Sequence, residues 1–218
     1  MISYEEAVAL QKELAKEICV VQNSTIGHAS LFGGADVAYV PKKGKAIAVV
    51  VAWNLKERQI VAAASAVLNI SFPYIPGLLS FRELPVLLEA WKKLKDRPEV
   101  WLVDGAGIAH PRRLGLASHF ALATEEKCVV GVAKSRLVGT HLPVPCTKGS
   151  WVPLVFEGDV VGTVLRSSNG VRPLYVSPGN GLSIIQAASV VLRACTRYRL
   201  PEPTRLAHAL VTKLRGSL

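Results

Sequence analysis

The chain has 218 residues, of which 50% are hydrophobic, and its formal net charge is +10. This length is sufficient for one domain with a substantial core, and the hydrophobic content excludes a disordered chain. The apolar run AIAVVVAW reaches only about half of a membrane span, and the acidic N-terminal segment lacks the basic-then-apolar pattern of a targeting signal. We therefore expect a single cytoplasmic domain over residues 1–218, with no membrane partner.

The excess of positive charge lies in the second half of the chain. Residues 1–100 carry 12 basic and 10 acidic residues, whereas residues 101–218 carry 14 basic and 6 acidic residues. This distribution fits a polyanionic partner, most simply nucleic acid, with a general solubilising charge as the alternative. The 4 cysteines lie at least 18 residues apart, which excludes a zinc finger and favours buried, reduced thiols.

The first part of the chain predicts one helix and three strands. Ser3 and Glu6 form a capping-box pattern, and apolar residues follow at helical spacing, at Ala7, Leu10, Leu14 and Ile18. Strand-like segments then occupy residues 34–40, 45–53 and 60–69. Because the turns between them are short, neighbouring strands must be antiparallel, and we expect a meander.

After residue 77 the pattern alternates between helix and strand. The expected elements are a helix over 80–95, a strand at 100–104, a helix near 114–124, strands at 128–133 and 151–166, a helix at about 182–197 and a last helix capped by Pro203-Thr204. A meander followed by this alternation predicts an α/β domain with a mixed sheet flanked by helices. The ribonuclease H-like architecture has this order, and it places its catalytic carboxylates on the first and fourth strands.

Two carboxylates occupy those two strands. Asp36 interrupts the small and apolar segment GGADVAYV, and Asp104 ends the apolar run in VWLVDG. A buried carboxylate is costly unless it is paired, hydrogen-bonded or bound to a metal. Oxygen ligands of this kind suit Mg²⁺ or Mn²⁺, so the pair predicts a divalent-cation site. A satisfied core acid and an ordinary turn at a strand end are the alternatives.

Six segments taken together resemble the endonuclease V family, whose members cleave nucleic acid near deaminated bases, especially hypoxanthine. They occur in family order over about residues 30–210, as GGADVAYV, FPYIPGLLSFRE, VDGAGIAHPRRLGLASH, GVAKSRL, RPLYVSPG and PEPTRLAHAL. The resemblance implies a Mg²⁺-dependent DNA repair endonuclease, with Mn²⁺ as a substitute. It would nick damaged DNA at the second phosphodiester bond 3′ to deoxyinosine and leave 3′-hydroxyl and 5′-phosphate ends.

Other functions remain open from the sequence. Inosine-containing RNA is an alternative substrate, and another ribonuclease H-like nuclease is an alternative enzyme. A non-catalytic nucleic-acid-binding module would use the basic half of the chain without the acidic residues. The small size and the strand-nicking chemistry make a monomer the expected state.

The resemblance assigns Asp36 and Asp104 as metal ligands and adds Glu83 as the third acidic residue of the active site. Sequence physics offers a different role for Glu83. Ser80 and Glu83 form an S-x-x-E capping box, in which Glu83 would bond back to the start of its own helix. One carboxylate cannot fully serve both roles, and the active-site role is the one we expect.

The resemblance also places His208 and Lys134 among the catalytic residues. His208 is expected in the first turn of the last helix, where the helix dipole favours a neutral imidazole that can bind a metal or accept a proton. Lys134 follows the apolar run CVVGVA, at the strand end where ligands usually approach an open sheet, and would hold the scissile phosphate. A surface histidine and a solvated lysine are the alternatives.

Tyr74 is the expected substrate wedge. It stands between Pro73 and Pro76 on a stiff turn, and a rigid exposed aromatic side chain can enter a base stack when a nucleotide flips out. Leu79 would support it. A packing aromatic residue is the alternative.

The segment that follows Asp104 supplies four further substrate-binding candidates. Gly105 and Gly107 would line a base pocket with backbone donors, and His110 and Arg112 would contact phosphate. Turn geometry and solvated loop charges are the alternatives.

Three positions stand apart from these assignments. Asn180 replaces a histidine and Ala106 replaces a polar residue that are frequent in the family, and the second change would alter selectivity in the base pocket. His119 has a family counterpart, but its chemistry suggests no role.

Overall fold

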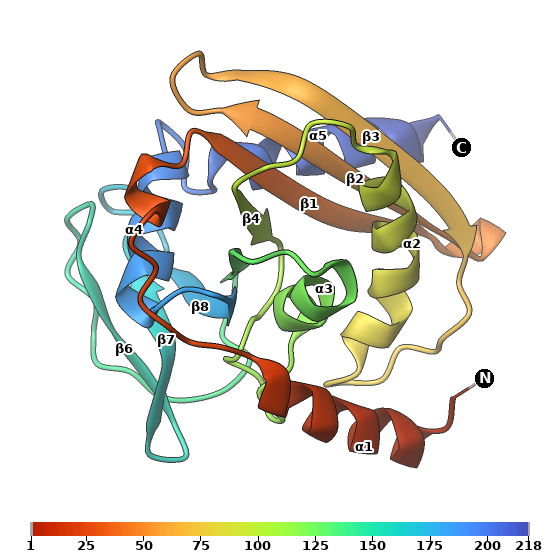
Figure 1. Cartoon of the computed structure of the whole chain (residues 1–218), viewed down its shortest axis with the longest axis horizontal. Coiled ribbons are helices and arrows are strands. Elements are labelled where there is room, and N and C mark those ends of the chain that lie inside the picture. The colour runs from red at the N-terminus through yellow and green to blue at the C-terminus, as the bar shows by residue number, and fades with distance from the viewer. Residues whose placement is uncertain (1, 218) are drawn as a thin grey trace.

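The computed structural model describes residues 2–217, which form one eight-stranded mixed sheet with helices on both faces (Figure 1). The strand order is β3-β2-β1-β4-β5-β8-β7-β6. The strands are β1 (Leu31–Val40), β2 (Lys45–Asn54), β3 (Gln59–Asn69), β4 (Val100–Val103), β5 (Val129–Ala133), β6 (Trp151–Phe156), β7 (Asp159–Leu165) and β8 (Leu174–Asn180). The helices are α1 (Tyr4–Leu14), α2 (Leu79–Lys93), α3 (Leu116–Thr124), α4 (Ile184–Ala194) and α5 (Glu202–Gly216).

The pairing of the strands confirms the predicted fold class. Strands β1, β2 and β3 form the antiparallel meander, and β4 and β5 then run parallel to β1. The predicted strand at 151–166 is two strands, β6 and β7, which form a hairpin. Together with β8 they extend the sheet in the antiparallel sense beyond β5.

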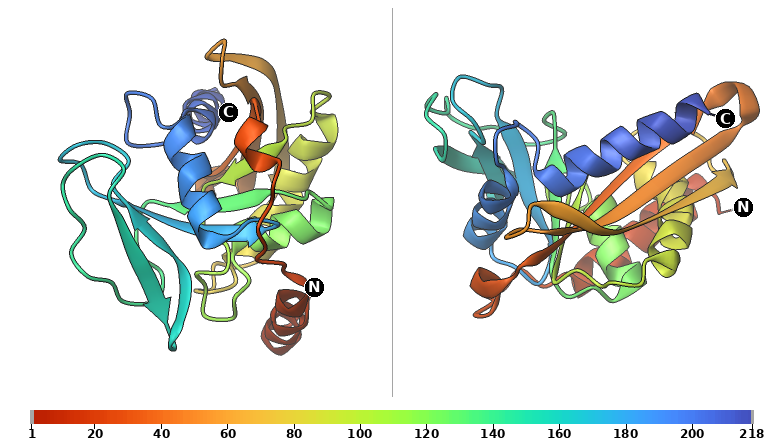
Figure 2. Two further views of the ribbon diagram at one scale, coloured as in Figure 1. Left: turned by 60° about the vertical axis from the view of Figure 1, so that its left-hand side comes forward. Right: turned by 90° about the horizontal axis from the view of Figure 1, so that it is seen from above.

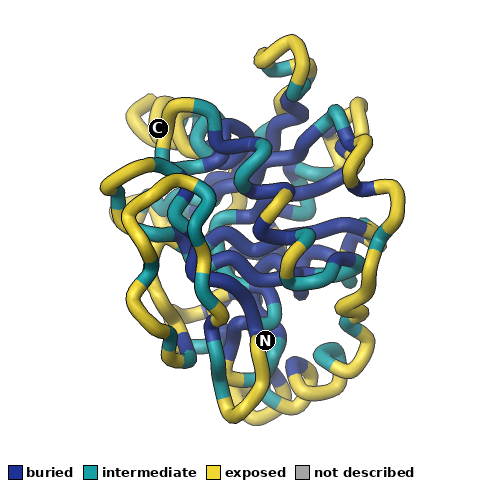
Figure 3. Tube along the Cα trace, turned by 90° about the vertical axis from the view of Figure 1, so that its left-hand side faces the viewer, coloured by how far each residue is buried: buried dark blue, intermediate teal, exposed yellow. Residues whose placement is uncertain are grey.

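The alternation of side chains along the strands separates two cores. On β4, Val100 and Leu102 pack with α4, whereas Trp101 and Val103 pack with α2 and α3 on the opposite face. Helix α5 covers β1 and β2 on the same side as α4, as the view from above shows (Figure 2). The buried strands therefore form the centre of a three-layer arrangement, with exposed loops around it (Figure 3). No described helix is long and apolar enough to cross a membrane.

The four cysteines are free, but only Cys128 and Cys195 are buried. Cys19 and Cys146 are exposed, which corrects the expectation that all four thiols lie in the interior.

Gly34 lets helix α5 approach the sheet closely. A Cβ atom at this position would lie 2.2 Å from the carbonyl oxygen of Pro203, in the first turn of α5. Such a distance is far below a normal contact, so any side chain here would push the helix away from β1. Gly34 lies two residues before Asp36 on the same face of the strand. The contact between glycine and helix therefore fixes how far α5 stands from Asp36.

We expect Gly34→Ala to destabilise the fold by roughly 1–3 kcal/mol through overpacking and to displace α5 from β1. Chemical denaturation would measure the change in the free energy of unfolding. Gly27→Ala is the matched control, because a Cβ atom at that position would meet no other atom within 4 Å. Equal stability of the two variants would contradict this account.

Candidate active site

Three central strands of the sheet bring polar side chains close together, near the carboxyl ends of β4 and β5. Strands β1, β4 and β5 are parallel, and Ala35 on β1 pairs with Val103 on β4. The residues that follow these two, Asp36 and Asp104, are therefore neighbours, and the Asp104 N–H donates to the Ala35 carbonyl at 3.2 Å. Lys134 follows the last residue of β5 in the same way. The predicted first-strand and fourth-strand carboxylates thus lie side by side.

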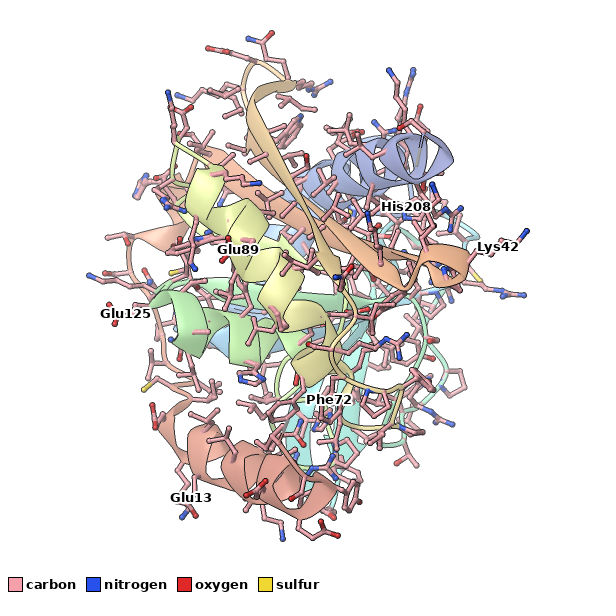
Figure 4. The ribbon with its side chains drawn as sticks, turned by 90° about the vertical axis from the view of Figure 1, so that its right-hand side faces the viewer. Glu13, Lys42, Phe72, Glu89, Glu125 and His208 are labelled. Atoms are coloured by element: carbon pink, nitrogen blue, oxygen red, sulfur yellow. The ribbon has the colours of Figure 1, made fainter. Side chains whose placement is uncertain are left out.

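Asp36 is buried and bonded to the helix above it. Its Oδ2 atom lies 2.7 Å from Nδ1 of His208 on α5. Burial raises the pKa of Asp36, and the negative charge of Asp104 adds to this effect, while the bond to His208 opposes it. Figure 4 shows His208 on α5 beside the strands of the meander. The side chain of His208 is 54% exposed, so its ring also faces solvent.

The position of His208 in its helix differs from the prediction. Helix α5 begins at Glu202 with Pro201 as the N-cap, and the Thr204 hydroxyl donates to the Pro201 carbonyl from within the helix. Pro203-Thr204 is therefore not the cap, and His208 lies in the second turn rather than the first. The helix dipole acts mainly within the first turn, so the bond to Asp36 is what orients the ring.

Glu83 serves the site rather than the end of its helix. Helix α2 begins at Leu79, and its N-cap, Leu78, makes no side-chain capping bond, so the Ser80–Glu83 capping box, the alternative role for Glu83, does not form. The Tyr39 hydroxyl instead donates to Oε1 of Glu83 at 3.0 Å. Burial raises the pKa of Glu83 to about 7; the bond from Tyr39 opposes this shift, and the charges of Asp104 and Asp36 add to it.

Asp104 and Lys134 form an ion pair through Oδ2 and Nζ. Both side chains are partly exposed, so the lysine ammonium group lies at the open side of the acidic cluster. Its positive charge lowers the pKa of Asp36 as well. The structure therefore brings together all five predicted catalytic residues, Asp36, Glu83, Asp104, Lys134 and His208.

The acidic cluster has the chemistry of a site for a hard cation. The charge of Asp104 raises the pKa values of both Asp36 and Glu83, and a cation would relieve this repulsion. Over residues 2–217, no three histidine, cysteine or acidic side chains gather closely enough to hold a metal by themselves. Mg²⁺ often takes only one or two protein carboxylates and completes its shell with water and phosphate. The carboxylates present fit that kind of open site.

An apolar cavity of about 150 Å³ adjoins the carboxylates. Apolar cavities of about this volume accept one aromatic ring. Tyr74 is 69% exposed at its rim. Four of the predicted substrate-binding residues line the cavity, namely Tyr74, Leu79, Gly105 and His110. Ala106 and Leu137 line it as well.

Gly107 lies outside this lining. Its N–H donates to the Ser177 hydroxyl at 2.8 Å, and a Cβ atom on it would lie 2.0 Å from the Pro178 carbonyl oxygen. This close packing corrects the expectation that Gly107 offers a backbone donor to a base.

His110 and Arg112 are bonded within the protein. The Arg112 guanidinium donates to the Gln11 side chain at 2.5 Å and to the Gly77 carbonyl at 2.6 Å. His110 Nδ1 accepts the Arg112 backbone N–H, so Nε2 carries the proton and donates to the same carbonyl at 3.0 Å. Burial lowers the pKa of His110 to about 4. These bonds correct the expectation that both side chains are free to contact phosphate.

Three unassigned positions also have partners. Asn180 accepts the Cys19 N–H at 2.9 Å and so anchors the segment after α1. Ala106 lines the cavity. His119 bonds through Nδ1 to the Ser80 hydroxyl at 3.0 Å, and burial lowers its pKa to about 4. His119 therefore orients a hydroxyl group in the cavity wall.

The sequence model of the endonuclease V family matches residues 12–209. The chain belongs to the endonuclease V family. An endonuclease V of Trichormus variabilis is 41% identical over 211 residues, which cover 97% of this chain and 95% of that protein. The crystal structure of endonuclease V from Streptomyces avermitilis has 36% sequence identity and a TM-score of 0.94, covering 100% of this chain and 95% of that one.

Another endonuclease V, from Ciona intestinalis, was solved in complex with a 24mer DNA that contains an inosine followed by a ribo-adenosine. It is 26% identical to this chain with a TM-score of 0.84, covering 96% of this chain and 95% of that one. Membership of the endonuclease V family makes the chain a nuclease, which hydrolyses phosphodiester bonds.

Sequence reasoning missed two residues of this endonuclease V site. Tyr39 bonds Glu83, and Leu137 lines the cavity. The alternation along β1 places Tyr39 on the face opposite to Asp36, but it gives no sign that Glu83 lies there. The exposed Leu137 follows Lys134 by three residues, and no spacing pattern predicts that it lines the same cavity as Tyr74.

We predict that Glu83→Gln stabilises the metal-free protein above pH 7. The pKa of Glu83 is about 7 in the folded chain against an ordinary value of 4.5. The unfolded chain therefore loses this proton first, and the free energy of unfolding falls as the pH rises between these values. Removing the ionisable group should recover up to about 3 kcal/mol at pH 8.

Urea unfolding in EDTA at pH 5 and pH 8 would measure this effect. Glu89→Gln is the matched control, since Glu89 lies exposed on the same helix and pairs with Lys92. A Glu83→Gln variant that gains no stability over the parent protein at pH 8 would contradict the destabilising effect assigned to burial.

Proposed function

We propose that this endonuclease V family member is a Mg²⁺-dependent DNA repair endonuclease that acts on hypoxanthine-containing strands. It cuts the second phosphodiester bond 3′ to the deaminated base and leaves 3′-hydroxyl and 5′-phosphate ends. The base is not removed. Inosine-containing RNA is the second candidate substrate, because the Ciona intestinalis complex holds an inosine followed by a ribonucleotide.

The adjacency of the cavity to the carboxylates carries this proposal. Gly105 lines the cavity, and it directly follows Asp104 in the chain. Leu79 lines the cavity as well, and Glu83 lies one turn further along the same helix, about 6 Å along the axis. A base held in the cavity would therefore place the neighbouring phosphates over the acidic cluster.

His208 is suited to accept a proton from the attacking water. Its Nδ1 donates to the Asp36 carboxylate, so the neutral ring presents Nε2 as an acceptor. The ring is half exposed and fixed in orientation by this bond. A base within hydrogen-bonding reach of the nucleophile typically accelerates such a step by about 10²–10⁴-fold.

The remaining residues would stabilise the negative charge of the phosphate and position the strand. Asp36 and Asp104 would hold Mg²⁺, or Mn²⁺ in its place, which supplies polarisation of the phosphate and neutralises developing negative charge. The Lys134 ammonium group, paired with Asp104 at the open side, would bind a phosphate oxygen. Tyr74 would fill the gap that the flipped nucleotide leaves in the base stack.

The direct test compares matched DNA and RNA strands that carry a single inosine, incubated with the protein and Mg²⁺. We expect cleavage at the second phosphodiester bond 3′ to inosine, mapped on a sequencing gel. Asp36→Ala and Asp104→Ala should each lower the rate by more than about 10³-fold, because each removes a ligand of the proposed cation. Full activity of either variant, or cleavage independent of inosine, would refute the assignment.

Tyr74→Ala should weaken binding to an inosine duplex by about 1–3 kcal/mol, the usual value of a base–aromatic stack. Binding to an undamaged duplex should change little, since no base is flipped there. Fluorescence anisotropy in Ca²⁺ without Mg²⁺ would measure both affinities. Tyr198→Ala is the matched control, because Tyr198 is also exposed but does not line the cavity. Equal losses in the two variants would count against the wedge.

A further inference from the structure

Helix α1 makes its buried contacts with the segment that carries Tyr74. The predicted apolar stripe of this helix coincides only in part with its buried face, because Ala7 is buried but Leu10 is exposed, and the polar Gln11 is buried as well. Ala7 packs with Phe72 and Leu78, which lie on either side of the Tyr74 turn. Figure 4 shows Phe72 above α1. Both buried residues of α1 thus face the region around the cavity.

Gln11 bonds to two segments that form different walls of the cavity. Its side-chain nitrogen Nε2 donates to the Gly77 carbonyl at 3.1 Å and to the Leu114 carbonyl at 3.1 Å. Gly77 lines the cavity itself, and Gly115, the residue after Leu114, lines it as well. One amide group, with no solvent exposure, therefore ties both walls together.

The Gly77 carbonyl is the point on which these bonds converge. It accepts hydrogen bonds from Gln11, His110 and Arg112. The Leu78 N–H donates to the Ile75 carbonyl at 2.9 Å, which closes the turn just after Tyr74. Gly77 has φ +78°, and a Cβ atom on it would lie 2.8 Å from the Arg112 guanidinium. Three side chains therefore hold the end of the Tyr74 turn in place.

We propose that Gln11 is a positioning residue that holds the Tyr74 turn against the Gly115 wall and so sets the selectivity for a flipped base. This inference rests on the proposed function, in which Tyr74 is the wedge and the cavity receives the base. None of the hydrogen bonds of Gln11 reaches Asp36, Glu83 or Asp104. Its loss should therefore weaken recognition of the base and leave the chemical step intact.

Two substitutions remove the donors while keeping the side-chain volume. Gln11→Met loses every hydrogen bond, whereas Gln11→Glu keeps an acceptor for Arg112 and loses the donors to the two carbonyls. Gln186→Met is the matched control. Gln186 also clamps a distant segment, because its amide donates to the Asn23 carbonyl at 2.6 Å and accepts the Asn23 N–H at 2.9 Å. It does not line the cavity.

The experiment measures binding, base flipping and catalysis on inosine and undamaged duplexes. Affinities are measured in Ca²⁺ without Mg²⁺, flipping is followed by 2-aminopurine fluorescence beside the inosine, and kcat and KM are measured in Mg²⁺. Both Gln11 variants should lose about five- to tenfold in affinity for the inosine duplex, the value of one or two hydrogen bonds. KM for the inosine duplex should rise by a similar factor, while kcat and the affinity for undamaged DNA change by less than about twofold. Gln186→Met should lose thermal stability without losing selectivity.

Three results would overturn the inference. The first is unchanged inosine selectivity in both Gln11 variants, and the second is a loss confined to kcat. The third is failure of both variants to fold, which would make Gln11 a residue of global stability. Absence of inosine-dependent binding and nicking in the unsubstituted protein would instead refute the proposed function, so the two failures are distinguishable.

Discussion

The close contact between Gly34 on β1 and Pro203 on α5 is the constraint on which the catalytic cluster depends. Because no side chain separates strand and helix there, His208 reaches Asp36 at 2.7 Å across 172 residues of sequence. That bond gives the buried carboxylate a partner and fixes the orientation of the imidazole ring. A helix held further from the sheet would remove the hydrogen bond that offsets part of the cost of burying Asp36. The absence of a side chain at Gly34 thus determines both how α5 packs on β1 and whether His208 reaches Asp36.

The acidic residues show the usual conflict between stability and function at an enzyme site. Burial and mutual repulsion raise the pKa values of Asp36 and Glu83, so in the absence of a cation these groups oppose folding at neutral pH. Tyr39, His208 and Lys134 each offset part of this cost through hydrogen bonds or charge. Closely spaced negative charges of this kind are what the proposed divalent cation would require.

In the proposed function, the cavity recognises the base and the acidic cluster cleaves the strand, and different residues support these two parts. Gln11, His110 and Arg112 form a network of hydrogen bonds around the Gly77 carbonyl, and none of these bonds involves a residue of the acidic cluster. Residues that resemble phosphate contacts in the sequence therefore act through the backbone of the Tyr74 turn. A network of this kind can change the position of the wedge while the carboxylates remain in place.

The sequence by itself determined the fold class and most of the order of strands and helices. It also singled out five candidate catalytic residues that the structure brings together, Asp36, Glu83, Asp104, Lys134 and His208. Short turns force an antiparallel meander, and a carboxylate in an apolar strand needs a partner, so the fold class and the pair Asp36 and Asp104 follow from local chemistry. The active-site expectations for Glu83, Lys134 and His208 came from the resemblance to the endonuclease V family. Tertiary structure alone decided what Glu83 contacts. Helix α2 begins at Leu79, so Ser80 lies inside the helix and cannot cap it, and the Tyr39 hydroxyl donates to the Glu83 carboxylate. It also decided that Gln11 is buried while Leu10 is exposed, and that Arg112 is bonded inside the protein. Partners so distant in sequence leave no periodic signal, because their meeting depends on how whole helices pack against the sheet.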